Sequence, residues 1–158
     1  MPTRSAFSPA VQDALAGRDA IVFDGECVLC SGFFRFVLRH DRRAHFHFVI
    51  AQSELGTQMF HDLGLPTDDY QTNLVVTGDE VHGGIDSFAA VMAKLPRPWP
   101  VLSVARVLPE AVKSPLYGLI ARNRYAIFGR AETCLIPGPD ITARFIDGGI
   151  SCPTPLAS

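Results

Sequence analysis

Apolar and polar residues follow two different periods along the first hundred residues, and these periods predict the secondary structure. Short apolar or alternating runs, typical of strands, are found at residues 20–23, 45–50, 73–77 and 80–82. Apolar residues with helical spacing are found between and after these runs, at about 28–40, 53–63 and 87–95. The first two strands are joined through a helix, which favours a parallel pair, whereas the Gly78-Asp79 turn favours an antiparallel hairpin.

The resulting order, β-α-β-α-β-β-α, predicts an α/β protein with a four-stranded mixed sheet flanked by helices. This is the arrangement of the thioredoxin-like fold. We expect Asp86 or Ser87 to cap the helix that ends near residue 95.

Three further segments complete a chain that we interpret as a single domain, 1–158. Residues 1–19 are expected to be an N-terminal surface extension, in which Ser8 caps a small helix at 9–16. The prolines of 96–100 end the core of residues 20–96. A helical appendix is expected at 97–130, with one helical pattern at 102–107 and another that begins at Ser114-Pro115. The loop-rich tail, 131–158, contains one strand-like piece, 141–146.

Charge and hydropathy exclude several classes of partner. The formal net charge is -2, which predicts no basic field for nucleic acid or anionic lipid. No apolar run is long enough to span a bilayer, and residues 1–19 contain no apolar core like that of a secretory signal. We therefore expect a cytoplasmic protein, in which cysteines are more often redox-active, metal-binding or inert than structural disulfides.

A Cys-x-x-Cys pair, Cys27 and Cys30, stands where the first strand passes into the first long helix. Residues three apart on a helix are about 5–6 Å from each other, a separation that a disulfide tolerates. Free amide N–H groups and the helix dipole stabilise a thiolate at a helix N-terminus. Cys27 is therefore the candidate nucleophile and Cys30 the candidate resolving thiol.

Asp24, three residues before Cys27, has two interpretations. Buried beside the pair, its carboxyl group would relay protons during thiol exchange. As a turn-former, it would accept hydrogen bonds from local backbone N–H groups. The spacing alone does not decide between these roles.

Two alternatives to redox chemistry remain for the same cysteines. A zinc site needs further ligands, for which Cys134, Cys152 and the histidines at 40, 45 and 47 are available. A non-catalytic interaction module would use the proline-rich break and the arginines near residue 125. A redox enzyme would act on a protein or small-molecule disulfide or thiol. It would need an external reductant or oxidant, because the chain lacks a Gly-x-Gly-x-x-Gly dinucleotide motif and we predict no cofactor.

Residues 24–30, Asp-Gly-Glu-Cys-Val-Leu-Cys, resemble the signature of the DCC family of predicted thiol-disulfide oxidoreductases. The resemblance covers roughly residues 20–137, and its further motifs are residues 48–53, Pro98-Trp99, 116–125 and 128–130. It implies a thioredoxin-like fold and a redox role for Cys27 and Cys30, with Asp24 as the third signature residue. Family members often carry a late cysteine where this chain has Cys134. Thioredoxins place a cis-proline before the third core strand, whereas Thr72 is expected at that place here, so the substrate surface is expected to differ.

The late arginines and cysteines have both a functional and a structural interpretation. Arg122, Arg124 and Arg130 either bind an anionic partner or anchor the appendix to carboxylates of the core. Cys134 is either a further exchanging thiol or a small buried residue, and Cys152 is interpreted as incidental.

Overall fold

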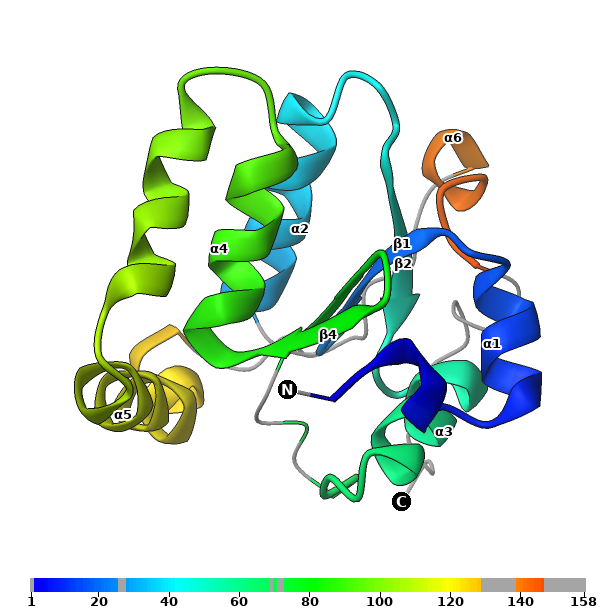
Figure 1. The fold of residues 1–158 in the computed structure, drawn as a ribbon, viewed down its shortest axis with the longest axis horizontal. Helices are drawn as coiled ribbons and strands as arrows, with labels where there is room; N and C mark the ends of the chain where they lie inside the picture. The colour runs from blue at the N-terminus through cyan, green and yellow to red at the C-terminus, as the bar shows by residue number, and fades with distance from the viewer. Residues whose placement is uncertain (1, 26–27, 69, 71–72, 129–138, 147–158) are drawn as a thin grey trace.

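The computed structural model describes residues 2–25, 28–68, 70, 73–128 and 139–146 of the chain (Figure 1). Its strands are β1 (Asp19–Phe23), β2 (Phe46–Ile50), β3 (Leu74–Thr77) and β4 (Glu80–Gly83). Its α-helices are α1 (Pro9–Leu15), α2 (Val28–His40), α3 (Glu54–Asp62), α4 (Gly84–Lys94), α5 (Glu110–Phe128) and α6 (Pro139–Thr142). Two 3-10 helices are η1 (Arg4–Ala6) and η2 (Trp99–Val107). The predicted β-α-β-α-β-β-α order is confirmed from β1 to α4.

The four strands form one mixed sheet in the order β2-β1-β3-β4. β1 is parallel to β2 and antiparallel to β3, and β3 and β4 form the predicted antiparallel hairpin. Ile21 of β1 lies opposite Phe48 on one side and Val75 on the other. The predicted class is confirmed, because an open four-stranded mixed sheet with helices is consistent with the thioredoxin-like fold.

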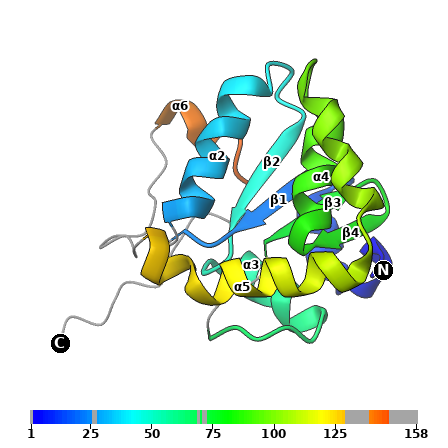
Figure 2. The same ribbon diagram turned by 90° about the vertical axis from the view of Figure 1, so that its left-hand side faces the viewer.

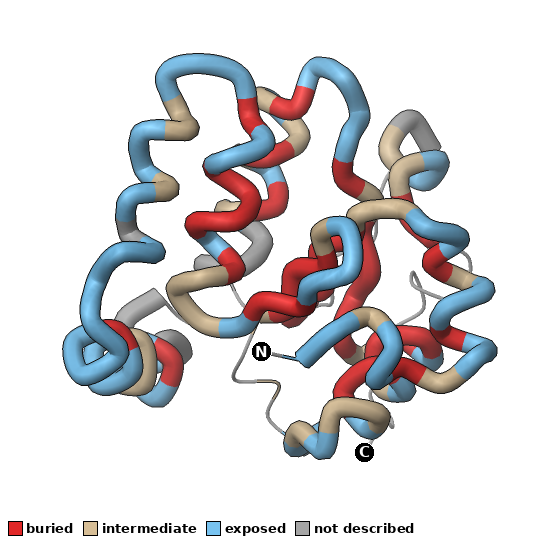
Figure 3. Tube along the Cα trace, viewed as in Figure 1, coloured by how far each residue is buried: buried red, intermediate tan, exposed pale blue. Residues whose placement is uncertain are grey.

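Alternate residues of β1 supply the two halves of the core. Ile21 and Phe23 belong to a cluster with residues of α2 and α4, in which the rings of Phe23 and Phe34 stack at 4.9 Å. Ala20 and Val22 point the other way, into a cluster with residues of α1 and α3. Figure 3 shows the buried residues concentrated along the central strands and the helix faces that cover them.

The N-terminal segment is part of the core, so its interpretation as a surface extension is wrong. Phe7, Val11 and Leu15 are buried in the cluster that α1 shares with α3. Ser8 stands at the N-cap of α1, but its side chain makes no capping hydrogen bond. Its backbone N–H donates instead to Asp62 Oδ2 at 2.8 Å, which ties the start of α1 to the end of α3.

α4 begins earlier than predicted, and neither Asp86 nor Ser87 is its N-cap. Gly83 occupies the N-cap, and Gly84 has a φ of 62°, a conformation that glycine adopts without a Cβ clash. Ser87 Oγ donates to Gly84 O at 2.6 Å, and Asp86 binds a lysine of α5. The glycine pair thus lets the helix start directly after β4.

The appendix contains two helical elements, but the start predicted for the second is wrong. α5 begins at Glu110, and its first turn closes when the N–H groups of Val112 and Lys113 donate to Pro109 O. Pro115 lies inside the helix, and Ser114 Oγ donates to Glu110 Oε1 at 2.7 Å instead of capping. The earlier proline, Pro109, is therefore the one that precedes the helix.

The strand expected at 141–146 is reduced to a single bridge. The segment starts inside α6, and only Phe145 pairs with β2, opposite Phe48. Arg144 fixes this segment, because its Nη2 donates to Asp41 Oδ2 at 2.7 Å and to Phe46 O at 2.8 Å. The end of the described chain therefore lies along the outer edge of β2.

Candidate active site

β1 delivers the candidate site to the edge of the sheet where α2 begins. Asp24 and Gly25 follow β1 directly, and α2 begins at Val28, so Cys30 is the third residue of the helix. Cys27 lies outside the described residues, and the side chain of Cys30 is not among those described. The strand and the helix that flank the pair are confirmed, whereas the geometry of the two thiols stays a prediction.

Asp24 is buried, with 1% of its surface exposed, and it contacts Gln52. Gln52 Nε2 donates to Asp24 Oδ1 at 2.5 Å, and Gln52 Oε1 accepts from the backbone N–H of Gly25 at 3.0 Å. One side chain thus holds both the carboxyl group and the backbone of the turn that leads to the cysteines. This contact differs from a simple turn-former, in which the carboxylate binds only local backbone.

Gln52 reaches the turn because β1 and β2 are parallel. Phe23 lies opposite Ile50 in the register, and the N–H of Ala51 donates to Phe23 O at 2.8 Å. The carboxyl ends of the two strands therefore meet, and the residues that follow them become neighbours. Sequence reasoning missed Gln52 as a site residue, although the predicted parallel pair placed it and Asp24 at one edge.

α5 passes across the beginnings of α2 and α4 (Figure 2). Its Tyr117 hydroxyl accepts from the backbone N–H of Asn73 at 3.3 Å, just before β3. The ring of Tyr117 also lies over Gly84, where an added Cβ would come within 3.7 Å of it. Tyr117 therefore joins α5 to the chain that enters β3 and to the start of α4.

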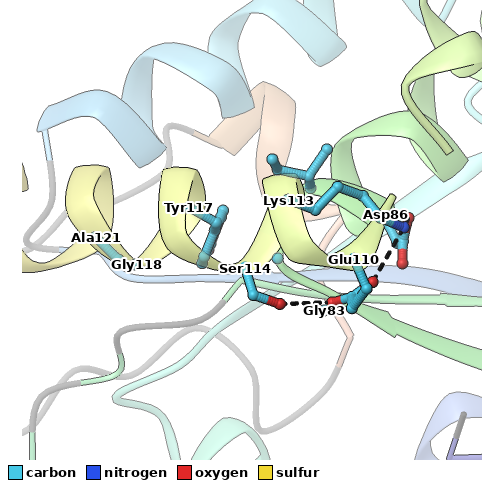
Figure 4. Close-up of a pocket in the computed structure, with 10 residues that line it drawn as sticks. Gly83, Asp86, Glu110, Lys113, Ser114, Tyr117, Gly118 and Ala121 are labelled. Carbon is cyan, nitrogen blue, oxygen red and sulfur yellow. Dashed lines mark hydrogen bonds and ion pairs between the residues drawn. The ribbon is translucent and has the colours of Figure 1, made fainter. Parts of the chain in front are cut away.

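A pocket of about 330 Å³ lies between α5 and the start of α4 (Figure 4). Lys113 Nζ is 2.9 Å from Asp86 Oδ1 and 3.3 Å from Glu110 Oε2. The hydrogen bond from Lys113 to Asp86 raises the pKa of the lysine above its usual value. The pKa of Glu110 is lowered by the hydrogen bonds that it accepts from Ser114 and Lys113. The Lys113 ammonium group therefore joins α5 to Asp86 of α4 at the wall of this pocket.

Of the other residues that the sequence singled out, the structure describes only some. Arg122 is exposed on α5, and the ion pair that the structure shows between α5 and the core is formed by Lys113 instead. The side chain of Arg124 is not described, and Arg130, Thr72, Cys134 and Cys152 lie outside the described residues. Sequence reasoning did not single out Lys113. The available signal was its spacing of four residues from Tyr117, which puts the two side chains on the same face of a helix.

Among the described residues, no group of three or more histidine, cysteine, aspartate or glutamate side chains is placed to hold a metal ion. The helices described here also include none that is both long and apolar enough to cross a membrane.

Known proteins resemble most of this chain in sequence. Residues 21–130 match the family described as DCC1-like thiol-disulfide oxidoreductase. An uncharacterized protein of Bacillus subtilis, YuxK, is 32% identical over 126 residues, which cover 80% of this chain and 92% of that protein. The DCC family protein At1g52590, chloroplastic, of Arabidopsis thaliana is 34% identical over 118 residues, 74% of this chain and 69% of that protein. No solved structure matches the chain.

Proposed function

The chain belongs to the DCC1-like thiol-disulfide oxidoreductase family and so has a general thiol-disulfide redox role, and from this premise we propose that it exchanges disulfides through Cys27 and Cys30. The observation that carries the proposal is the strand–turn–helix arrangement of β1, Asp24-Gly25 and α2. α2 begins at Val28, and a helix N-terminus is an environment that lowers the pKa of a cysteine, which supports the proposal.

In the proposed reaction, the reduced enzyme transfers two electrons to a substrate disulfide. The Cys27 thiolate attacks one sulfur of the substrate, forms a mixed disulfide with it and releases the other substrate sulfur as a thiolate, which takes up a proton. Cys30 loses its proton and attacks the Sγ of Cys27. This second step forms the Cys27–Cys30 disulfide and releases the remaining substrate thiol.

Asp24 is proposed to accept the proton that Cys30 loses in the second step. Its burial and its hydrogen bond to Gln52 support this role, because a carboxyl group held in one orientation is positioned for proton transfer. Gln52 is then a positioning residue, since it holds Asp24 and the turn at Gly25.

A complete cycle needs a second redox partner. We propose a protein or small-molecule disulfide as substrate and an external dithiol as the source of electrons, with the cytoplasm as the setting. The reverse direction, in which the oxidised enzyme accepts electrons from a substrate dithiol, uses the same two steps in reverse order.

Trapping of the mixed disulfide tests the proposal. In a Cys134→Ser and Cys152→Ser background, Cys30→Ser should accumulate a covalent adduct with a model disulfide on Cys27, because the resolving thiol is missing. Cys27→Ser in the same background is the matched control and should form far less adduct. Peptide mapping by mass spectrometry measures both. An adduct found equally in the two variants would reject Cys27 as the nucleophile, and absence of a reversible 27–30 disulfide at every redox potential tested would reject the proposed function.

A further inference from the structure

The outer surface of η2 carries a line of exposed valines. A 3-10 helix has three residues per turn, so residues spaced by three lie above one another. Val101, Val104 and Val107 form such a line on η2, and their exposed fractions are 69%, 65% and 79%. Trp99 of the same helix instead packs against Phe36 of α2, with ring centroids 4.8 Å apart. η2 is therefore attached through its aromatic residue and turns its valines to solvent.

From residue 110 to residue 122, α5 has the reverse of the usual amphipathic arrangement. Three apolar residues with i, i+4 and i, i+3 spacing lie on its outward side, between 46% and 55% exposed: Val112, Leu116 and Leu119. The side that faces the core carries Lys113, Tyr117 and Ala121, of which Lys113 and Ala121 are buried. A surface helix normally turns its apolar stripe to the core. α5 turns leucines to solvent while a lysine faces inward.

The two elements adjoin, because η2 leads through Leu108 and Pro109 into α5 (Figure 2). With Leu102, Leu108 and Ile120 added, this surface has nine apolar side chains, each between 38% and 79% exposed. Large exposed apolar patches on a monomer are often functional. We call this surface the η2–α5 face.

Exposed basic residues accompany the η2–α5 face along the chain. Lys94, Arg97, Arg106 and Arg122 are exposed on the elements that form or flank it. Between residues 94 and 122 the sequence has five lysines and arginines and one acidic residue, Glu110, which is engaged by Lys113. The net charge of -2 for the whole chain therefore conceals an excess of positive charge within residues 94–122.

We propose that the η2–α5 face docks the protein on a membrane surface that contains anionic lipid. An apolar stripe flanked by lysines and arginines is the pattern by which an interfacial helix binds such a surface, apolar side chains entering the acyl boundary and cations contacting the headgroups. A second copy of the chain would bring like charges together around the same stripe, which disfavours self-association. Because α5 also contacts α2, a docked molecule holds the beginning of α2 near the lipid surface. The docking does not rest on the proposed thiol chemistry.

Vesicle co-sedimentation of the full chain tests the docking. Vesicles of phosphatidylcholine with added phosphatidylglycerol should bind the protein, phosphatidylcholine alone should bind it much less, and high salt should weaken binding. Val104→Asp and Leu116→Asp should each lower the partition coefficient more than about tenfold, since each removes apolar area and adds a carboxylate. Arg106→Gln should lower it about fivefold, the contribution of one surface cation.

The controls separate docking from folding and from self-association. Ala10→Asp adds the same charge at an exposed position of α1, on the opposite side of the sheet in Figure 1, and should bind as the wild type does. Cys27→Ser should also bind normally. Retention of full binding by Val104→Asp, or absence of binding to anionic vesicles, overturns the proposal. A lipid-free dimer in sedimentation velocity that Val104→Asp dissociates would assign the face to a second copy and overturn it too.

Discussion

Replacement of Gln52 by leucine measures how much the Gln52 bridge stabilises the protein. This bridge is the pair of hydrogen bonds through which the Gln52 side chain joins Asp24 and Gly25. Gln52→Leu keeps a side chain of similar size but removes the amide that donates to Asp24 and accepts from Gly25. A hydrogen bond contributes about 1.5–3 kcal/mol where one partner is charged and about 0.5–1.5 kcal/mol where both partners are neutral. We therefore expect the free energy of unfolding of the reduced protein to fall by about 2–4 kcal/mol.

Urea denaturation measures this loss. With a denaturant slope of about 2 kcal/mol per M, the middle of the usual range for urea, the expected shift of the unfolding midpoint is about 1–2 M. Gln58→Leu is the matched control, because Gln58 Nε2 donates to Asp62 Oδ1 at 2.7 Å in the same kind of pair at an exposed place. Exposure leaves such a bond worth a few tenths of a kcal/mol, about 0.2–0.5. Equal midpoints for Gln52→Leu and wild type would refute the stabilising role of the bridge.

Asp24→Asn separates positioning from proton transfer. An asparagine oxygen can still accept from Gln52 Nε2, so this variant should lose less stability than Gln52→Leu. It cannot take the proton of Cys30, so the second step of exchange should slow at neutral pH. Single-turnover release of thiol from a preformed mixed disulfide measures that step as a function of pH. An unchanged rate and pH profile would reject Asp24 as the proton acceptor while leaving Gln52 as a structural residue.

Two further predictions concern the fold. Gly56→Ala should destabilise the protein by more than about 1–3 kcal/mol, because the new Cβ would overlap the carbonyl oxygens of Ile50 and Ala51. Gly32→Ala in α2 is the matched control: its Cβ meets no atom within 4 Å, so it should stabilise the protein by about 0.5–1 kcal/mol. Equal urea midpoints for the two variants would contradict this. Burial lowers the pKa of His82 below 6.5, so the unfolded chain binds a proton that the folded chain does not as the pH falls through 6.5. Stability should therefore be constant above that value and decrease below it, and His82→Gln should make the decrease shallower in denaturation curves measured between neutral and mildly acidic pH.

The elements of the sheet and of α2 were predictable because local pattern and tertiary structure agree there. Ile21, Val22 and Phe23 are apolar and strand-forming, and they are buried on both faces of a central strand, as a continuous apolar run indicates. The hairpin at Gly78 was predictable for a similar reason, since its φ of 56° suits glycine. In both places one short segment contains all the information that determines its structure.

The helix starts and Gln52 were not predictable in the same way, because they depend on residues distant in the chain. Asp86 is a good N-cap by residue type, yet it forms an ion pair with Lys113, 27 residues later. Gln52 is an ordinary polar residue in a turn until the parallel register brings it to Asp24, 28 residues earlier. Neither contact leaves a periodic signal, so a three-dimensional arrangement is needed to reveal it.

α5 contacts the core on one side and presents the η2–α5 face on the other. Tyr117 faces inward and binds the backbone of Asn73, whereas its neighbour Leu116 is 46% exposed on the η2–α5 face. The inward side is attached by a hydroxyl and an ammonium group, because the apolar residues that would normally hold a helix to the core lie on the outward side. A helix needed only to cover the sheet would gain more from turning its leucines inward, by roughly 1.5–3 kcal/mol for each one buried. The observed orientation therefore favours a function for the outer surface, beside the edge of the sheet where thiol exchange is proposed.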